Sequence, residues 1–354
     1  MKTKLFITLF WSFVFGTASI GAQIPEYYSS VNFTQDGNAL KDDLSTLIIN
    51  THTTLIPYTS GSTDTWDVIH ISDLDPTISN NVILFYGYDD TDNDTFNDRT
   101  RAIAYQQSNS PCIGYWNREH VFAKSLANPS LETDFPGPGT DVHNLRAADC
   151  QMNSLRNNNY YRDGSGNSFL DEDFYPGDEF KGDVARIILY MYLRYPGQCE
   201  AVDSATGPIT YAIQNDMPDL LLEWNQDDPV SDFELTRNDV IYSYQGNRNP
   251  FIDNPFLANL IWNGPQAIDT WGTLSLIDYD NQGISIYPTI TDDSIVISGL
   301  GLNKFKTTVY NQLGQAVLES NNEKNINVSK LPAGLYILVI HDSEQINSLK
   351  FIKN

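Results

Sequence analysis

The chain has 354 residues and a formal net charge of −24, because 45 Asp and Glu outnumber 21 Lys and Arg. Its 41% hydrophobic residues suffice for a core, which excludes wholesale disorder, and the length suggests two domains or one large domain with an appendage. So acidic a protein should repel phosphate backbones over most of its surface, which argues against nucleic-acid binding through a broad electrostatic footprint.

Residues 1–22 are predicted to be a secretory signal peptide. Lys2 and Lys4 precede an apolar run from Leu5 to Phe15, and small residues follow as far as Ala22. This layout predicts cleavage before Gln23. The apolar run is short for a membrane span, and no later run reaches about 18 uninterrupted apolar residues, so we expect no stable membrane insertion.

The middle of the chain predicts an α+β domain with many loops. Apolar residues recur at helical spacing in 38–52, residues 81–86 favour a buried strand, and 183–195 favour a buried helix. Ser231 and Glu234 form a candidate capping box before another helix.

From about Gly283 the pattern changes to seven short β-type runs separated by turn residues. This spacing predicts a small all-β, sandwich-like domain at 284–354. We place the boundary near residues 279–284.

Two stretches, 115–125 and 141–161, hold many polar residues among apolar ones. Buried polar groups cost free energy unless each is paired, so packing alone explains such a cluster poorly. Phosphodiester hydrolysis would use these residue types: a neutral imidazole to activate water, oxygen ligands for a hard cation such as Mg²⁺, and a guanidinium to grip phosphate. The cluster contains Arg118, Glu119, His120, Asp141, His143, Asn144, Arg146, Asp149, Asn153 and Arg156.

Three motifs in this cluster, NREHV at 117–121, DVHNL at 141–145 and NSLRNN at 153–158, resemble the bacterial endonuclease I family of secreted nucleases. The resemblance covers about residues 26–265. It implies a ββα-metal (His-metal finger) core embedded in a mainly helical, loop-rich domain at 23–280.

The resemblance also implies roles for individual residues. His120 matches the general base, and Glu119 and Asn153 match the ligands of one Mg²⁺, for which Mn²⁺ or Ca²⁺ are alternatives. The implied products carry 5′-phosphates. Some members place a phosphate-stabilising Arg between the first two motifs, where this chain has only Lys124 as a cation; the candidates for that role are Arg146, Arg156 and Arg186.

Other residues of the cluster have two interpretations. We expect Arg118 to pair with an acid and orient its strand. His143, Asn144 and Asp141 are expected either to support the site or to act in it. Arg186 is either buried in a salt bridge or directed into the cleft, and the cleft is favoured.

Glu119 and His120 are adjacent, so in a regular strand their side chains would point to opposite faces. If both serve one site, the strand must end or bulge there.

Three cysteines, Cys112, Cys150 and Cys199, allow one disulfide and one free thiol in an oxidising compartment. Their spacing does not select the pair.

Residues 284–354 resemble the C-terminal sorting domain of proteins exported by the type IX secretion route. The matching segments are YPT at 287–289, LPAGLY at 331–336 and KFIK at 350–353. The resemblance implies that the secretion machinery is a partner and that the enzyme ends outside the cell or on its surface. The alternative is a carbohydrate- or surface-binding β-module.

The sequence therefore predicts a secreted, monomeric, Mg²⁺-dependent and largely sequence-nonspecific endonuclease for DNA, with RNA as a further candidate substrate. A metal-dependent phosphodiesterase for small nucleotides and a surface adhesin on a nuclease-like scaffold are the alternatives. The acidity is not uniform, since residues 115–162 hold five cations and five acids. A nuclease that grips its substrate locally remains compatible with the net charge.

Overall fold

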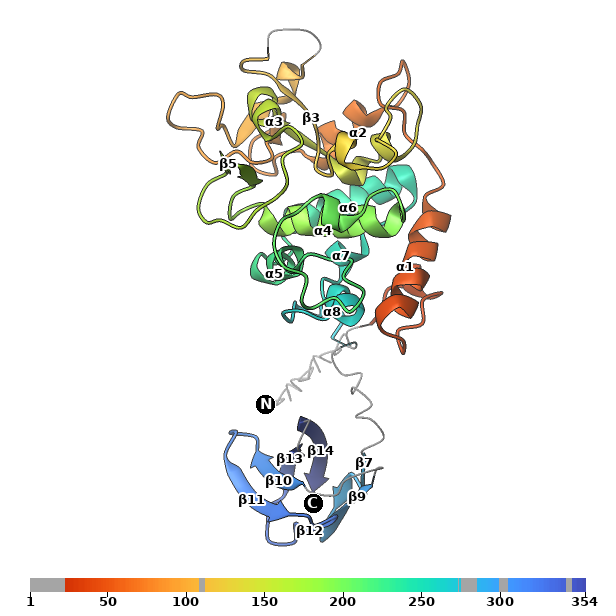
Figure 1. Ribbon diagram of the computed structural model, residues 1–354, viewed down its shortest axis with the longest axis vertical. Coiled ribbons are helices and arrows are strands. Elements are labelled where there is room, and N and C mark those ends of the chain that lie inside the picture. The colour runs from red at the N-terminus through yellow and green to blue at the C-terminus, as the bar shows by residue number, and fades with distance from the viewer. Residues whose placement is uncertain (1–22, 108–111, 273, 275–284, 299–304, 342–345) are drawn as a thin grey trace, which may run out of the picture. The chain divides into compact units, whose positions relative to one another are not determined.

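The computed structural model describes residues 23–107, 112–272, 274, 285–298, 305–341 and 346–354. These residues form two compact units, divided between Ser275 and Leu276 (Figure 1). The predicted signal peptide at 1–22 and the predicted boundary at 279–284 lie outside the described residues.

The first unit is mixed α/β, and its largest hydrophobic core lies among its helices. The two clearest helix predictions, 38–52 and 183–195, are confirmed, and the capping box of Ser231 and Glu234 is present. The α-helices of the described residues are α1 (Gly37–Thr51), α2 (Thr65–Ser72), α3 (Cys150–Arg156), α4 (Lys181–Arg194), α5 (Asp219–Asp227), α6 (Asp232–Gln245), α7 (Pro250–Asp253) and α8 (Leu257–Trp262).

Helix α4 lies at the centre of the helical part, with α1, α5 and α7 packed against it (Figure 1). Most of its residues are buried, including the charged Asp183 and Arg186. Because a buried charge needs a partner, this helix requires acids and arginines from other segments to pair with it.

Within the described residues, the strands of the first unit form three antiparallel pairs. These are β1 (Asn81–Ile83) with β2 (Thr100–Ala102), β3 (Trp116–His120) with β4 (Leu145–Asp149), and β5 (Phe169–Asp171) with β6 (Asp173–Tyr175). Helix α3 follows β4 directly, so the paired strands β3 and β4 and the helix α3 form a ββα arrangement. Figure 1 shows β3 and α3 at one end of the unit, far from α8.

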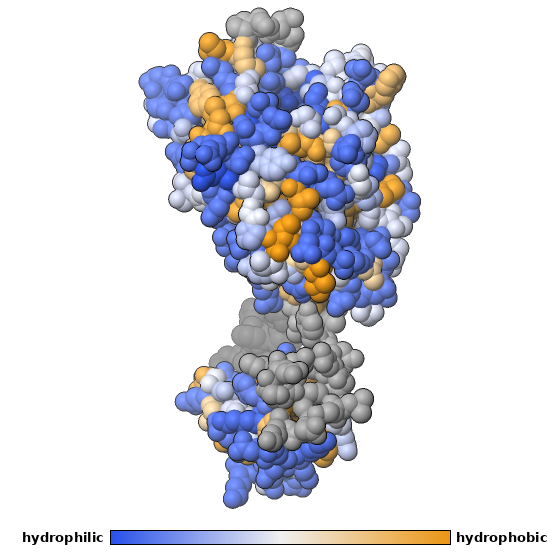
Figure 2. Space-filling model, in the orientation of Figure 1, coloured by the Kyte–Doolittle hydropathy of each residue, from blue (hydrophilic) through white to orange (hydrophobic). Residues whose placement is uncertain are grey.

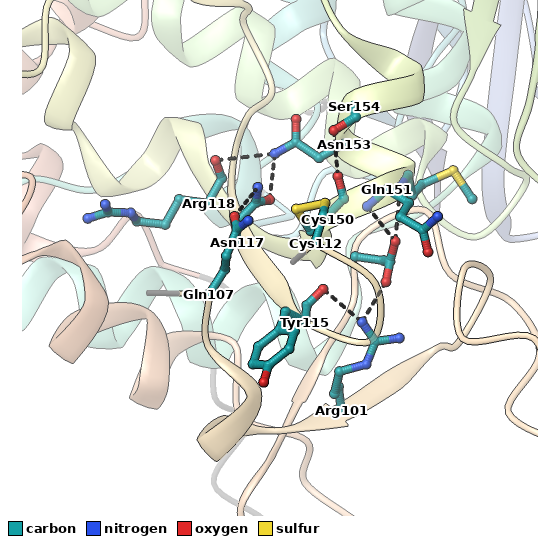
Figure 3. The surroundings of a disulfide bond; sticks show 12 residues. Arg101, Gln107, Cys112, Tyr115, Asn117, Arg118, Cys150, Gln151, Asn153 and Ser154 are labelled. Carbon is teal, nitrogen blue, oxygen red and sulfur yellow. Dashed lines mark hydrogen bonds and ion pairs between the residues drawn. A yellow bond between two sulfur atoms is a disulfide. The ribbon is translucent and has the colours of Figure 1, made fainter. Parts of the chain in front are cut away.

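A disulfide joins Cys112 to Cys150, which resolves the pairing that the sequence left open, and Cys199 is a buried free thiol. Cys150 is the first residue of α3, so the bond ties the start of this helix to the segment before β3 (Figure 3). Asp149 caps the same helix by accepting from the backbone N–H groups of Gln151 and Met152. Arg101 donates to that Asp149 carboxylate at 2.5 Å and holds the cap in place.

Opening this disulfide is expected to destabilise the first unit. The bond closes a loop with a sequence separation of 38, and removal of such a bond costs roughly 2–4 kcal/mol. Guanidinium unfolding of the Cys112→Ser/Cys150→Ser variant, followed by tryptophan fluorescence, should show this loss. A reducing agent should lower the stability of the wild type but not that of the variant, and equal stability of the two oxidised proteins would contradict the prediction.

The C-terminal unit is all-β, as predicted. Its two sheets have the orders β11-β10-β13-β14-β8 and β12-β9-β7, and one hydrophobic cluster contains residues from both, such as Val309, Leu338 and Ile295. The strands are β7 (Ser285–Tyr287), β8 (Ile290–Thr291), β9 (Ser294–Ser298), β10 (Lys306–Asn311), β11 (Ala316–Asn321), β12 (Asn325–Asn327), β13 (Gly334–His341) and β14 (Ile346–Lys353).

Hydrophilic side chains cover most of the visible face of the first unit, with smaller apolar areas between them (Figure 2). Within the described ranges, every helix is too short or too polar to cross a membrane.

Candidate active site

The end of β3 brings Glu119 and His120 to one cavity of about 360 Å³. The strand ends at His120, which is one of the two arrangements that the sequence required for adjacent residues to serve one site. Asn153, from the exposed side of α3, lines the same cavity. The other lining residues are Tyr58, Arg118, Ala123, Lys124, Ser125, Ser154, Asn157 and Asn158.

The hydrogen bond of His120 determines which ring nitrogen carries the proton. Its Nε2 lies 2.8 Å from the backbone oxygen of Gly139. Because a carbonyl oxygen only accepts, Nε2 donates, and Nδ1 keeps its lone pair. Burial lowers the pKa of His120 to about 3, so the ring is neutral at pH 7. The Tyr58 ring stacks on the imidazole with centroids 5.7 Å apart.

The position of the Gly139 carbonyl depends on a tight backbone contact. A Cβ at Gly139 would lie 2.1 Å from the backbone oxygen of Glu132, so only glycine fits there. Gly139 was not predicted as a site residue, although the Pro- and Gly-rich run at 136–139 is a turn signal that could have marked it.

Glu119 is a buried carboxylate with incomplete charge compensation. The Tyr86 hydroxyl donates to its Oε1 at 3.1 Å, and Nη1 of Arg156 lies 3.5 Å away. Burial raises the pKa of Glu119 to about 7, despite the opposing effect of Arg156. A further positive charge beside this carboxylate would therefore be strongly favourable.

Asn153 is oriented by two hydrogen bonds from its amide nitrogen. The nitrogen donates to Oδ1 of Asn117 at 2.8 Å and to the backbone oxygen of Arg118 at 3.4 Å. Figure 3 shows the amide oxygen of Asn153 pointing away from both partners. This oxygen is therefore directed away from β3 and is a suitable ligand for a cation.

Glu119 and Asn153 together fit a hard divalent cation. A carboxylate and an amide oxygen are ligands that Mg²⁺, Mn²⁺ and Ca²⁺ accept, and Mg²⁺ retains several waters beside a few protein oxygens. In the part of the chain that the structure describes, no three His, Cys, Asp or Glu side chains gather as a metal cluster. A cation at Glu119 and Asn153 would complete its coordination with water and substrate oxygens.

None of the three candidate phosphate arginines lines the cavity. Arg146 is buried between Asp73 and Asp183, with its Nη1 2.7 Å from Oδ2 of Asp183. Arg186 is buried against Glu234, with its Nε 2.6 Å from Oε1. The expectation that Arg186 points into the cleft is wrong, because α4 is enclosed and its guanidinium pairs inside the protein.

Arg156 lies behind the cavity instead of lining it. It is fully buried and donates to the backbone oxygens of His120, at 3.2 Å, and Val121, at 2.8 Å. With its contact to Glu119, this arginine holds the end of β3 in place.

The cations that line the cavity are Arg118 and Lys124. Lys124 is exposed, whereas Arg118 is 8% exposed and donates to the hydroxyl of Thr65 at 2.8 Å and to the carbonyl of Tyr58. Lys124 was identified from the sequence as the cation between the first two motifs, but the role of stabilising the phosphate was predicted for arginines instead.

The remaining candidates of the second motif make internal contacts. The Asp141 carboxylate accepts from the hydroxyls of Tyr190 and Tyr195, and Nε2 of His143 lies 3.3 Å from the backbone oxygen of Asn247. Both hydrogen-bonding atoms of the Asn144 amide pair with the backbone of Phe122, linking the turn before β4 to the segment after His120. These positions favour supporting roles over contact with substrate.

Tyr58 and Tyr86 contact the central residues of the site but were not expected from the sequence. Tyr58 stacks on His120, and Tyr86 donates to Glu119. Each comes from a segment remote from the motifs, and aromatic residues are common in cores, so no local pattern distinguished them.

Two paired strands, β3 and β4, and the helix α3 frame this cavity, and comparison with known proteins identifies the class. The chain belongs to the endonuclease I family, since the model of that family, described as Endonuclease I, matches residues 36–256. The family and the relatives below make this protein a secreted nuclease.

Two curated relatives are similar to the chain over most of their length. Both are named extracellular ribonuclease. The protein of Bacillus subtilis (strain 168) is 39% identical over 237 residues, which cover 64% of this chain and 75% of the relative. That of Bacillus amyloliquefaciens is 38% identical over 253 residues, which cover 68% and 79%.

A second family model, the secretion system C-terminal sorting domain, matches residues 285–354. Together with the extracellular relatives, it assigns the protein to the outside of the cell or to its surface.

Proposed function

We propose that this protein is a Mg²⁺-dependent endonuclease that hydrolyses both DNA and RNA with little sequence preference and leaves 5′-phosphates. One observation carries the proposal: the neutral imidazole of His120, with Nδ1 free of the proton, shares a cavity with Glu119 and Asn153. These three groups are a base and two oxygen ligands for a cation.

In the proposed mechanism, Nδ1 of His120 takes a proton from the attacking water. The Gly139 carbonyl and the Tyr58 ring keep the imidazole in the orientation and tautomer that this step needs. Glu119 and Asn153 would hold the divalent cation, which polarises the phosphate and neutralises the leaving oxygen when bound. Lys124, exposed on the cavity wall, is the residue we assign to a phosphate oxygen.

The choice of DNA and RNA follows from the nucleophile. If water attacks the phosphorus, the reaction does not need the 2′-hydroxyl of RNA, so a deoxyribose backbone is also a substrate. The relatives named extracellular ribonuclease support RNA as one of the two substrates. The C-terminal unit would serve export, with the type IX secretion machinery as its partner and no part in the chemistry.

Digestion of plasmid DNA, single-stranded DNA and RNA tests this function. Cleavage of all three should require Mg²⁺, stop with a chelator and yield ends that a 5′-phosphate-dependent exonuclease accepts. RNA products ending in 2′,3′-cyclic phosphate, with DNA left intact, would instead show attack by the 2′-hydroxyl. Cleavage restricted to dinucleotides or other small diesters would support the alternative of a small-nucleotide phosphodiesterase.

The buried Glu119 makes a prediction about pH. Because burial raises its pKa to about 7, protons compete with Mg²⁺ for the carboxylate below that pH. Apparent Mg²⁺ affinity is therefore expected to fall by up to about tenfold per pH unit below 7 and to level off above about 8. Calorimetric titrations from pH 6 to 9 in buffers of different ionisation enthalpy would measure the affinity and the protons released.

Glu119→Gln is the control, since the amide does not titrate in this range. It should bind Mg²⁺ weakly, without this dependence on pH. Equal Mg²⁺ affinity of the wild type at pH 6 and pH 8 would contradict the assignment of Glu119 as a ligand.

A further inference from the structure

A second cavity, of about 620 Å³, adjoins the active-site cavity. Arg118 lines both, and the segment after Ile56 contributes to both walls, with Tyr58 in the first cavity and Thr59 to Asp67 mostly in the second. The volume lies in the range of pockets that hold small organic ligands, roughly 300–1,000 Å³. A substrate bound at His120 therefore has a neighbouring pocket that begins at one guanidinium.

Arg118 is a buried cation that forms no ion pair with a described carboxylate, unlike what the sequence led us to expect. Its guanidinium carbon lies 3.3 Å from the centroid of the Tyr58 ring and 3.9 Å from that of Trp66, so it is sandwiched between two aromatic rings. Its hydrogen-bond acceptors are neutral and its Nε has none. The carboxylate of Asp64 acts on it electrostatically, but without forming a direct ion pair. Arg146, Arg156 and Arg186 all form direct ion pairs. A phosphate next to Arg118 would supply the missing negative charge.

The rest of the second cavity offers amide groups. Gln106 and Gln107 both line it. Nε2 of His70 lies 2.6 Å from Oε1 of Gln106, and the amide of Asn117 donates to Oε1 of Gln107 at 3.3 Å. Because the amide oxygens are engaged, the amino groups of both glutamines are the atoms available to donate to a ligand.

The two acids of this cavity are engaged with the start of α2. Asp64 accepts from the backbone N–H groups of Ser60, Trp66 and Asp67, and Asp67 accepts from that of Asp64. Their charge thus stabilises the helix N-terminus. A ligand therefore meets one cation at the rim, amide donors, the aromatic Trp66 and two carboxylates. This setting suits a nucleobase better than a row of phosphates, which the carboxylates would repel.

Resting on the proposed nuclease activity, we propose that this second cavity binds the base and sugar of the nucleotide next to the scissile phosphate. Arg118 lies on the phosphate side, and the amides of Gln106 and Gln107 donate to acceptor atoms of the base. The protein would then hold its substrate by one neighbouring nucleotide as well as by the phosphate. A strongly acidic nuclease needs such local contacts, because its surface as a whole repels nucleic acid.

Single-stranded oligonucleotides with one abasic residue test this proposal. With the wild type, the linkage on one side of the abasic residue should be cut about fivefold more slowly, or more, than the same linkage in the intact oligonucleotide. In the Gln106→Ala/Gln107→Ala variant, the intact and abasic substrates should be cut at similar rates. Gln107→Leu, which removes the donor but keeps the bulk, is a second variant in case the double variant folds poorly.

The matched control is Gln266→Ala, an exposed amide of the same unit that lines neither cavity. This variant should cut the abasic substrate more slowly than the intact one by the same factor as the wild type does. Two results would overturn this inference but not the proposed function. In the first, the wild type cuts the linkages on both sides of the abasic residue as fast as those of the intact oligonucleotide. In the second, both glutamine variants still cut the abasic substrate more slowly by the full factor seen with the wild type. A wild type that fails to cut the intact oligonucleotide with Mg²⁺ would overturn the proposed function and this inference with it.

Discussion

Replacement of His120 by alanine is expected to lower kcat for Mg²⁺-dependent cleavage by about 10²- to 10⁴-fold, the usual contribution of a general base. The expectation rests on the tautomer of this ring, whose Nε2 donates to the Gly139 carbonyl and whose Nδ1 is left as the basic atom. Because the imidazole is already neutral in the fold, its loss removes the base without leaving a buried charge. Steady-state cleavage of a fluorescent oligonucleotide would measure the effect.

The control for this variant is His341→Ala, which changes a histidine of β13 in the C-terminal unit. It should cleave at the wild-type rate. Circular dichroism and Mg²⁺ binding should show that His120→Ala is folded and still binds the cation, since Glu119 and Asn153 remain. A folded His120→Ala protein that cleaves within a few fold of the wild type would show that another group acts as the base.

Replacement of Asp73 by alanine is expected to cause the largest loss of stability, roughly 3–5 kcal/mol. Asp73 is fully buried and accepts from Nε of Arg237 at 2.9 Å, Nε of Arg146 at 3.2 Å and the backbone N–H of Ala147 at 2.9 Å. Its removal would leave two buried guanidinium groups with less negative charge. The midpoint of urea unfolding, followed by tryptophan fluorescence, would measure the loss.

The control for the Asp73 variant removes the acid of a surface ion pair in the same unit. Arg162 and Asp171 lie 3.0 Å apart, but their side chains are 35% and 70% exposed. Asp171→Ala is therefore expected to cost at most about 1 kcal/mol. A loss of similar size in both variants would show that the buried network around Asp73 does not contribute as its geometry suggests.

Net charge was a poor guide to function, because it does not show where the charges lie or how they are paired. The sequence counts 45 acidic residues as equal, but several of them are buried partners of arginines. Asp73 pairs with Arg146 and Arg237, and Glu234 pairs with Arg186. Because each of these buried acids is matched by a buried arginine, the pairs leave the net charge unchanged. What the sum of charges conceals is that cations also line the cavity.

Contacts between remote segments explain why the sequence misplaced the arginines, although it brought the other candidate residues of the site together. Glu119, His120 and Asn153 lie in short motifs, and local order along a strand end and a helix suffices to bring them together. Whether an arginine faces the cavity depends on acids far away in the chain. Arg186 and Glu234 are 48 residues apart, and Arg146 and Asp73 are 73 residues apart.

The sequence by itself determined the family, the main helices, the all-β C-terminal unit and the three residues proposed for the chemistry. These depend on local patterns, because periodicity and motif spacing reflect contacts between residues close in the chain. Only the tertiary structure decided the disulfide pair, the tautomer of His120, the roles of the arginines and the cavity beside Arg118. Each of these depends on which remote segments pack together, since a buried charge or ring nitrogen takes its partner from whatever the fold places beside it.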